Sequence, residues 1–295
     1  MRFIRTKAVL VSAALAVTLA ACGDAGSDDK GRDVDADKDA AAALPDGSRM
    51  KEIADSGKVN IGVKFDQPGL GFKGATDDVP TGFDIEIAKI LASKLGLKTS
   101  DINWVETVSD NREPFLTSGK VDLVLASYSI TDDRRKVVGQ TGPYMITGQQ
   151  LLVKSDSDVD SIDDLKGQEV CSVTGSTSID GINEHGAKGV GFDSYSECVQ
   201  KVLDGTVSAM STDGSILMGY AAENEGDLKV VGDEFTEERI GVGYSKKEPE
   251  MCQWINDSLT SAFDDGSWAD AFELTLGKSG SETPEPPTLD ECPAA

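Results

Sequence analysis

Residues 127–144 contain hydroxyl and basic side chains at a spacing that suits the binding of a carboxylate. They follow an apolar run, 121–126, that is typical of a buried strand, and Thr131 then provides the start of a short helix. Backbone N–H groups at a helix start and the Ser129 hydroxyl hold anions, and Arg134, one turn later, would close on the same anion as a fork. The alternative is a capped surface helix with a solvated arginine.

The composition is that of a globular protein with room for two domains. The chain has 295 residues, of which 39% are hydrophobic and 27% are charged, as in ordinary globular proteins. Its net charge is −24, whereas binding to phosphate backbones requires a basic face. We therefore expect no nucleic acid among its partners.

The N-terminus has the features of a signal peptide, which we place at residues 1–21. Three cations lie within the first seven residues, and the apolar run 8–20 is too short to span a bilayer. The sequence Leu19-Ala20-Ala21-Cys22 follows and resembles a bacterial lipobox. This resemblance implies cleavage before Cys22 and a lipid anchor there, with diacylglycerol on the thiol and a fatty acyl group such as palmitate on the new amino group. An uncleaved membrane anchor is the alternative.

Residues 22–48 are expected to form an acidic, flexible tether. Seven aspartates lie between residues 24 and 39, and Val34 is the only β-branched residue of residues 23–43. Such a segment buries too little apolar surface to offset the entropy lost on ordering. It would let a folded body stand away from the outer face of the membrane.

The remaining cysteines are even in number, which suits disulfides in an oxidising compartment. We favour pairing neighbours in the chain, which means Cys171 with Cys198 and Cys252 with Cys292. The second pair would fasten a Pro-rich tail, residues 280–295, to a C-terminal helix. A zinc site is the alternative, but the cysteine spacing does not fit one and His185 is the only histidine. The sequence does not determine the connectivity.

Strand and helix patterns alternate along the chain, which predicts an α/β fold with largely parallel sheets and helices on their faces. In the first half we expect strands at 58–65, 102–106 and 121–126, a helix at 82–95, and a short helix at 111–118 that is broken near Pro114. In the second half we expect strands at 149–154, 169–173, 189–193, 207–211 and 239–244, and helices at 162–165, 178–184, 196–203, 215–223, 249–263 and 267–276.

A repeated phrase supports two related lobes. Residues 119–122 precede one polar turn, and the similar residues 205–208 precede another at 211–213. Open α/β sheets bind ligands at the carboxyl ends of their strands, so two such edges facing each other would form a cleft. The chain would cross between lobes near 147–150 and 239–242, and two short crossings permit closure. The expected domains are lobe 1 at 49–147 plus 243–279 and lobe 2 at 148–242.

Several short phrases, found in both lobes, are shared with a known family. They are Phe65-Asp66-Gln67-Pro68, Thr81-Gly82-Phe83-Asp84, Gly119-Lys120-Val121-Asp122-Leu123, Ser129-Ile130-Thr131-Asp132-Asp133-Arg134, Gly142-Pro143-Tyr144 and Val173-Thr174-Gly175-Ser176-Thr177. Through them, residues 53–277 resemble the extracellular solute-binding proteins of the polar amino acid family (family 3), the receptor subunits of ABC importers. Glutamate-binding lipoproteins of Gram-positive actinobacteria are the members that the chain resembles most.

This resemblance implies a two-lobed periplasmic-binding-protein-like (type II) fold, in which each lobe is a mixed, mostly parallel sheet flanked by helices. The two lobes would be joined by a two-strand hinge. It also implies a monomer without a cofactor, which passes an amino acid to ABC permease and ATPase subunits.

The resemblance assigns roles to the polar turns. Arg134 should pair with the α-carboxylate of an amino acid, helped by Ser129 and by main-chain groups near Ser127. The turn Gly175-Ser176-Thr177 should add donors when the cleft closes. Asp213 should accept the α-ammonium group, and capping of the next helix is its alternative role.

Two further cations would select the ligand. Arg112, in the phrase Ser109-Asp110-Asn111-Arg112, and Lys64 occupy positions where acidic-amino-acid binders of the family place cations. A desolvated side-chain carboxylate needs such partners because an unpaired buried anion is very costly. We therefore expect L-glutamate, or else aspartate, with Ser109 also in the site. The alternative is that Arg112 and Lys64 are surface cations.

A receptor that does no chemistry on its ligand is the favoured function, so we expect no enzyme. The first alternative is a cyclohexadienyl dehydratase-like enzyme on the same fold, but His185 and the aspartates of the cleft form no evident catalytic pair. The second is an amino acid sensor, for which a transmembrane helix or a signalling module would be expected after residue 277.

Overall fold

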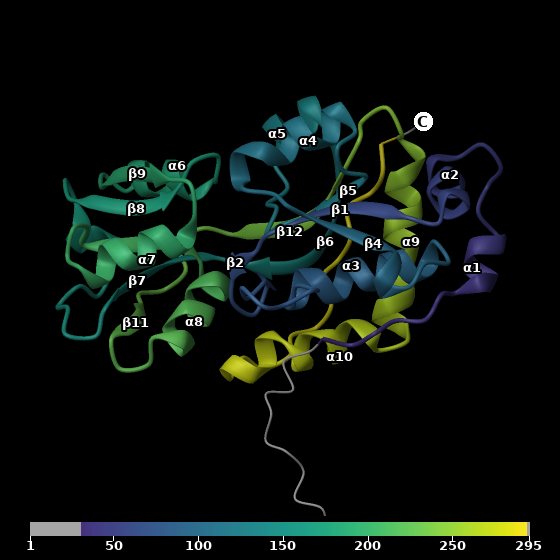
Figure 1. Cartoon of the computed structure of the whole chain (residues 1–295). Coiled ribbons are helices and arrows are strands. Elements are labelled where there is room, and N and C mark those ends of the chain that lie inside the picture. Colours follow the sequence, from purple (N-terminus) through teal and green to yellow (C-terminus); the bar gives the residue numbers. More distant parts are fainter. Residues whose placement is uncertain (1–30, 294–295) are drawn as a thin grey trace, which may run out of the picture. The chain divides into compact units, whose positions relative to one another are not determined.

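The computed structural model describes residues 31–293, which form two lobes, each built on a five-stranded sheet flanked by helices (Figure 1). The α/β class expected from the alternation of strands and helices is confirmed. The expected signal peptide and Cys22 lie outside the described residues. None of the helices within residues 31–293 is long and apolar enough to cross a bilayer.

The first sheet consists of β1 (Val59–Val63), β4 (Ile102–Glu106), β5 (Leu123–Leu125), β6 (Gly139–Thr147) and β12 (Glu238–Tyr244). Its strand order is β4-β1-β5-β12-β6. β1 pairs in parallel with β4 and β5, whereas β12 runs antiparallel to β5 and β6. Ile61, Val63 and Leu125 are fully buried because helices cover the inner strands on both faces.

The helices of this lobe are α2 (Arg49–Ser56), α3 (Phe83–Lys94), α4 (Arg112–Ser118), α5 (Asp132–Val137), α9 (Glu250–Asp264) and α10 (Ser267–Leu274), with 3-10 turns at Thr99–Asp101, Ser109–Asn111 and Leu276–Ser279. A small hairpin joins β2 (Asp66–Gln67) to β3 (Gly71–Phe72). As expected, the end of the chain returns to the first lobe, where α9 packs against β6 and α10 against α3. Trp268 is a core residue, since it is fully buried and donates through Nε1 to the Tyr144 carbonyl at 2.8 Å.

The second sheet consists of β7 (Gln149–Lys154), β8 (Glu169–Val173), β9 (Lys188–Phe192), β10 (Ala209–Asp213) and β11 (Leu228–Val231), in the order β11-β7-β10-β8-β9. Its helices are α6 (Ser178–Glu184), α7 (Tyr195–Leu203) and α8 (Gly214–Glu223), with a 3-10 turn at Ile162–Leu165. β8 pairs in parallel with β9 and β10, and β7 runs antiparallel to β10 and β11. The sheet is therefore mixed, as expected, with two parallel and two antiparallel pairings.

Some elements differ from the expectation. α4 is continuous through Pro114, because a proline in the first helical turn has no intrahelical N–H bond to lose. β6 was not expected in a segment with glycines and Pro143, yet an edge strand tolerates a proline, and β6 lies at the edge of the described sheet, next to β12. β10 begins at Ala209 instead of 207 and carries Asp213 as its last residue.

The two lobes are joined by adjacent crossings. Gly148 separates β6 from β7, and its N–H donates to Glu234 on the return crossing at 3.0 Å. β12 already pairs with β6 at Glu238, so residues 238–242 belong to the first sheet and not to the second lobe, where they were expected. The second crossing therefore lies before residue 238, because strand pairing with β6 holds β12 in the first lobe.

The described part of the expected tether, residues 31–48, packs on the first lobe. It contains the short helix α1 (Lys38–Ala42), and Asp37 pairs with Lys94 at the end of α3 at 3.0 Å. The Asp37 N–H also donates to the Ser93 carbonyl, and Leu44 is buried. Residues 31–48 thus differ from the flexible tether that we expected, because their polar groups find partners on the folded lobe.

Both expected disulfides are present. Cys171 and Cys198 have a Cα–Cα distance of 5.7 Å, and Cys252 and Cys292 one of 5.8 Å. The zinc alternative is therefore wrong, and residues 31–293 contain no cluster of His, Cys, Asp and Glu that would hold a metal ion.

The Cys252–Cys292 bond holds part of the Pro-rich tail on α9. Asp290 of the tail forms ion pairs with Arg135 and Arg239, and Asn256 of α9 donates to its carbonyl at 2.7 Å. The tail is therefore fastened to the first lobe, as expected, by polar contacts in addition to the disulfide.

Candidate functional site

A polar cavity lies where strands of both sheets end. The residues that line it are Ser109, Arg112, Ser127, Ser129, Arg134, Ser176, Thr177, Ser178, Tyr195 and Asp213. Lys64 and Gly175, which were also expected in the site, contact this lining directly: Lys64 Nζ donates to Ser109 Oγ at 2.9 Å, and the Gly175 carbonyl accepts from two arginines. All of the side chains predicted from the sequence thus lie together, and their roles toward a ligand remain predictions.

Arg134 is buried against other groups and is not a solvated surface residue. The Thr131 hydroxyl caps α5 by accepting from the Arg134 N–H at 3.2 Å, so the cap of the simpler alternative is present. The side chain, however, is only 10% exposed; Nε pairs with Glu113 at 3.3 Å and Nη1 donates to the Ser129 carbonyl at 2.7 Å. The guanidinium is therefore held in place at the edge of the cavity.

Gly175 brings the second lobe onto the first. Its φ is +79°, and a Cβ at this position would lie 2.2 Å from Oδ1 of Asp110 in the first lobe, so only glycine fits. The Gly175 carbonyl accepts from Nη2 of Arg112 and from Nη2 of Arg134, both at 3.0 Å. These two hydrogen bonds join the lobes across the cleft.

Arg112 supports the main chain around the cavity. Its Nε donates to the Ser109 carbonyl at 3.1 Å, and Nη1 donates to the carbonyls of Ala126 and Ser127 at 3.3 and 3.2 Å. Burial and the nearby charge of Arg134 lower the pKa of Arg112 to about 10. Arg112 is thus no surface cation, and its donors hold strand ends in place as well as facing the cavity.

Lys64, just after β1, is likewise buried, with 3% of its surface exposed. Burial first and the charge of Arg112 second lower the pKa of Lys64 to about 7, while Asp66 and Asp84 act in the opposite direction. An ammonium group has three donors, and Ser109 accepts one of them. Lys64 therefore has hydrogen-bonding capacity left for an anion.

Asp213 is a buried carboxylate in need of a cationic partner. It occupies the N-cap position of α8, as the alternative role required, but its side chain makes no capping hydrogen bond. Within residues 31–293 the carboxylate accepts no hydrogen bond, and burial together with the charge of Glu238 raises its pKa well above the usual range. An ammonium group placed here would relieve both effects.

Two supporting residues were not assigned a role from the sequence. Asp84 of α3 accepts from the Ser127 N–H at 2.8 Å and from the Tyr144 hydroxyl at 2.7 Å. These bonds hold Ser127 in the left-handed region, at φ +40°, where a non-glycine residue is strained. Asp84 belongs to the phrase Thr81-Gly82-Phe83-Asp84, but nothing in that phrase shows which backbone group it binds.

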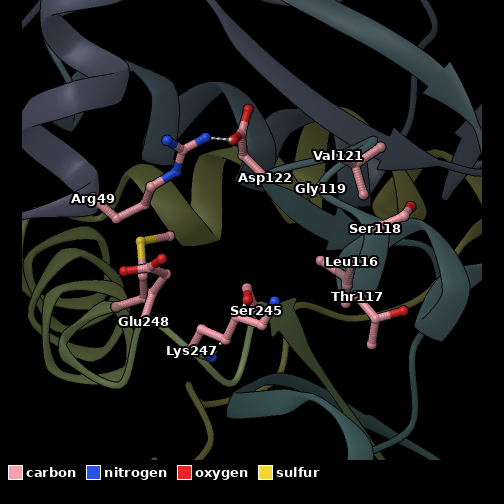
Figure 2. Close-up of a pocket in the computed structure, with 11 residues that line it drawn as sticks. Arg49, Leu116, Thr117, Ser118, Gly119, Val121, Asp122, Ser245, Lys247 and Glu248 are labelled. Carbon is pink, nitrogen blue, oxygen red and sulfur yellow. Dashed lines mark hydrogen bonds and ion pairs between the residues drawn. The ribbon is translucent and has the colours of Figure 1, made fainter.

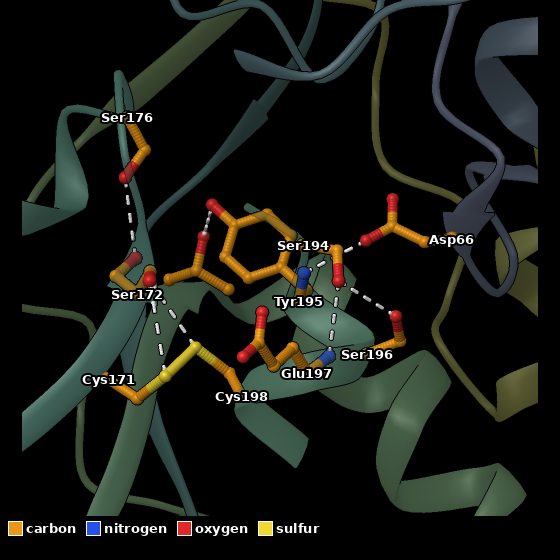
Figure 3. Close-up of a disulfide and its surroundings, with 10 residues drawn as sticks. Asp66, Cys171, Ser172, Ser176, Ser194, Tyr195, Ser196, Glu197 and Cys198 are labelled. Atoms are coloured by element: carbon orange, nitrogen blue, oxygen red, sulfur yellow. Dashed lines mark hydrogen bonds between the residues drawn. A yellow bond between two sulfur atoms is a disulfide. The ribbon is translucent and has the colours of Figure 1, made fainter. Parts of the chain in front are cut away.

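Tyr195, at the start of α7, was also missed. Its hydroxyl accepts from Thr212 at 2.7 Å, and its N–H donates to Asp66 of the first lobe at 2.9 Å (Figure 3). The Cys171–Cys198 disulfide joins α7 to β8, below the Ser176 side chain (Figure 3). The disulfide therefore couples two walls of the cavity, and no local sequence pattern reveals this.

A second cavity, of about 210 Å³, lies on the first lobe and contains none of the predicted site residues (Figure 2). Arg49 and Asp122 form an ion pair at 2.6 Å on its wall, and Lys247 and Glu248 line it as well. The polar cavity between the lobes has a volume of only about 10 Å³, roughly room for one water molecule. An amino acid would therefore enter only when the lobes separate.

Comparison with known proteins agrees with this geometry. The model of the bacterial extracellular solute-binding proteins, family 3, matches residues 59–277. The glutamate-binding protein GluB of Corynebacterium glutamicum is 36% identical over 94% of this chain and 92% of its own length. The ABC transporter glutamine-binding protein GlnH of Bacillus subtilis is 33% identical over 92% of this chain and 97% of its own. Both relatives are named as binding proteins and not as enzymes, in agreement with the expected role.

A solved structure supports the fold. The ancestral amino acid-binding protein AncCDT-1, a precursor of cyclohexadienyl dehydratase, matches with a TM-score of 0.71 and 34% identity, over 78% of this chain and 100% of that one. The two-lobed fold and the family model, which covers most of both lobes, lead to the same assignment. The chain belongs to family 3 of the bacterial extracellular solute-binding proteins.

Proposed function

We propose that this protein captures an acidic amino acid, L-glutamate or else aspartate, by closing its lobes and delivers it to ABC permease and ATPase subunits. The observation that carries the proposal is the arrangement of charges in one buried cavity. Arg134 lines this cavity and Lys64 contacts its lining, and each has N–H donors that could bind a carboxylate. Asp213, among residues 31–293, has no hydrogen-bond donor and could bind an ammonium group. A free dicarboxylic amino acid has this combination of charges.

The α-carboxylate would bind at Arg134. Nη2 of Arg134 now donates to the Gly175 carbonyl, and it would turn to the ligand as the cleft opens and closes again. The Ser129 side chain and the Ser176-Thr177 turn add hydroxyl and N–H donors from the two lobes. Asp213 would then receive the α-ammonium group as a charge-assisted partner.

The side-chain carboxylate would bind at Lys64. The buried Lys64 ammonium group has one protein acceptor, so the carboxylate of a ligand would stabilise its charge. The neutral amide of glutamine would stabilise that charge much less. The positive charge of Arg112 favours an anion at the same place. The relatives are named for glutamate and for glutamine, so their names leave the choice open, and the buried Lys64 ammonium group supports glutamate.

We also propose that the mature protein is a monomer held on the outer face of the cell membrane by lipid on Cys22. The lipobox at residues 19–22 supports the anchor. Mass spectrometry of the membrane-extracted protein should find a lipidated N-terminal cysteine. Recovery of an unmodified chain that begins at Met1 would contradict the anchor.

Calorimetry with a panel of amino acids tests the ligand. Glutamate should bind most tightly, aspartate next, and glutamine at least about tenfold more weakly than glutamate, because the last lacks the charge that Lys64 would pair. Arginine and cystine should not compete. Tight binding of glutamine without binding of glutamate would overturn the proposal.

Replacing Lys64 by methionine should remove the preference for acidic ligands. Methionine keeps the apolar length but not the charge, so glutamate affinity should fall by roughly 2 to 5 kcal/mol, about 30- to 5,000-fold. Glutamine affinity should change by less than about threefold. Lys154→Met, on an exposed residue of β7, is the matched control and should change neither affinity. Equal losses for both ligands in Lys64→Met would assign Lys64 a structural role only.

Glutamate binding should take up a proton above pH 7. Burial and Arg112 lower the pKa of Lys64 to about 7, so the side chain is largely neutral at pH 8, and a bound carboxylate would raise that pKa again. Glutamate affinity should therefore fall as the pH rises from 7 to 9, by up to about tenfold per unit. Calorimetry in buffers of different ionisation enthalpy measures the proton uptake. Lys64→Met should show neither the uptake nor the slope, and a wild-type protein without them would contradict this prediction.

A further inference from the structure

We propose that Tyr128 is a positioning residue, whose aromatic ring holds the two arginines of the cleft next to each other for the ligand. The inference rests on the proposed function for its ligand. The Cζ atom of Arg112 lies 4.6 Å from the centre of the Tyr128 ring, and that of Arg134 lies 5.0 Å from it. Both distances lie within the range of cation–π attraction. Tyr128 itself is fully buried and does not line the cavity.

The two arginines need such support because they repel each other. Both donate to one acceptor, the Gly175 carbonyl, and the charge of Arg134 is among the causes that lower the pKa of Arg112. Glu113 forms an ion pair with Arg134. The negative face of an aromatic ring attracts both cations without adding a carboxylate that would repel the ligand.

The ring itself is held rigidly. Gly243 of β12 lies so close that a Cβ there would be 2.7 Å from Cε1 of Tyr128, and the Tyr128 carbonyl accepts from the Gly241 N–H at 3.0 Å. Leu116, Val124 and Val138 form the rest of its apolar surroundings. The ring therefore cannot turn away from the arginines without a shift of β12.

The hydroxyl group contributes little to this role. It is buried and finds no hydrogen-bond partner of normal geometry within residues 31–293. Burial and the neighbouring Glu113 raise the pKa of Tyr128, so the phenol stays neutral. The ring and not the hydroxyl should thus be required, which separates Tyr128→Phe from Tyr128→Leu.

The binding test compares these two variants by calorimetry with glutamate and glutamine. Tyr128→Phe should bind both ligands within about twofold of the wild type, whereas Tyr128→Leu, which lacks the ring, should bind both at least about tenfold more weakly. Val138→Ala is the control for a loss of packing in the same cluster, and it should leave both affinities unchanged at a comparable loss of stability. A Tyr128→Leu variant that binds like the wild type, or a Tyr128→Phe variant that loses as much as Tyr128→Leu, would overturn the inference.

A second measurement needs no ligand and keeps the inference separate from the proposed function. Phenylglyoxal modification, mapped by mass spectrometry, should proceed several-fold faster at Arg134 in Tyr128→Leu than in the wild type, because the guanidinium is released. Arg135, on the same helix, pairs with Asp290 and does not contact Tyr128, so it should react equally fast in both proteins. If the wild type binds no amino acid, the proposed function fails and the modification rates still decide on Tyr128. An unchanged rate at Arg134 would overturn its role.

Discussion

Arg134→Ala should abolish measurable binding of every amino acid that the wild type binds. The change removes the guanidinium fork proposed for the α-carboxylate, which all these ligands share. It also leaves Glu113, its partner at 3.3 Å, without a counter-charge beside the cleft, where it would repel the incoming carboxylate. Loss of a charge-assisted contact of this kind costs roughly 2 to 5 kcal/mol, or about 30- to 5,000-fold in affinity, and the repulsion adds to that cost.

Calorimetry with glutamate and glutamine measures the effect. Arg134→Lys keeps the charge but not the two-pronged geometry, so it should recover only part of the affinity. Arg135→Ala, which removes a neighbour that pairs with Asp290 of the tail, is the matched control and should leave both affinities near the wild-type values. Binding by Arg134→Ala within tenfold of the wild type would show that the α-carboxylate lies elsewhere.

Asp213→Asn should weaken the binding of every amino acid about as much as Arg134→Ala does, but it should not destabilise the protein. Asparagine keeps the shape but not the charge, so the ammonium group of every ligand would lose its partner, at a cost of roughly 2 to 5 kcal/mol. Stability should not fall, because the Asp213 carboxylate is buried without a hydrogen bond within residues 31–293. Its raised pKa means that the native state binds the proton more tightly than the unfolded chain does. The penalty therefore grows as the pH rises above the unfolded pKa near 3.8, and it keeps growing until the pH passes the raised pKa of the native state.

Calorimetry and chemical denaturation at pH 7 together test this pair of effects. Asp213→Asn should bind both glutamate and glutamine at least about 30-fold more weakly and should unfold at the same or a higher denaturant concentration. Asp180→Asn, on an exposed residue of α6, should change neither property. A variant that binds normally but is less stable would make Asp213 a structural residue and would leave the ammonium group without an assigned partner.

The strands that were predicted well are the apolar ones. β1, β5 and β8 are short runs of buried residues, and burial on both faces selects an apolar side chain at nearly every position. β6 and β11 were missed because an edge strand owes its existence to pairing with a neighbour, and local composition says little about that. Residues 31–48 were expected to be flexible because their own composition is polar. The groups that order them lie on α3, far away in the sequence.

Some residues of the candidate site could likewise be named from the sequence, and others could not. Ser129 and Arg134 could be named in advance because a polar turn and a helix start that follow an apolar strand lie at the edge of a sheet, whereas Asp213 was named through the resemblance to a family. Tyr128 lies between two of the predicted serines, but its proposed role depends on two guanidiniums and on Gly243, which come from three other elements. Sequence alone offered no reason to separate it from any core tyrosine.

The amino-acid sequence by itself determined the α/β class and the two related lobes, and it favoured the correct disulfide pairs without fixing their connectivity. The class and the lobes follow from patterns within short stretches, where hydrophobic period and spacing act directly, whereas most residues of the cleft were named through the resemblance to a family. Only the tertiary structure decided that Arg112 holds strand ends, that Asp213 lacks a hydrogen-bond donor among residues 31–293 and that Lys64 is buried with capacity for an anion. The physical reason is that charge, burial and hydrogen bonding are properties of neighbours in space, and the chain brings those neighbours together only when both lobes have folded.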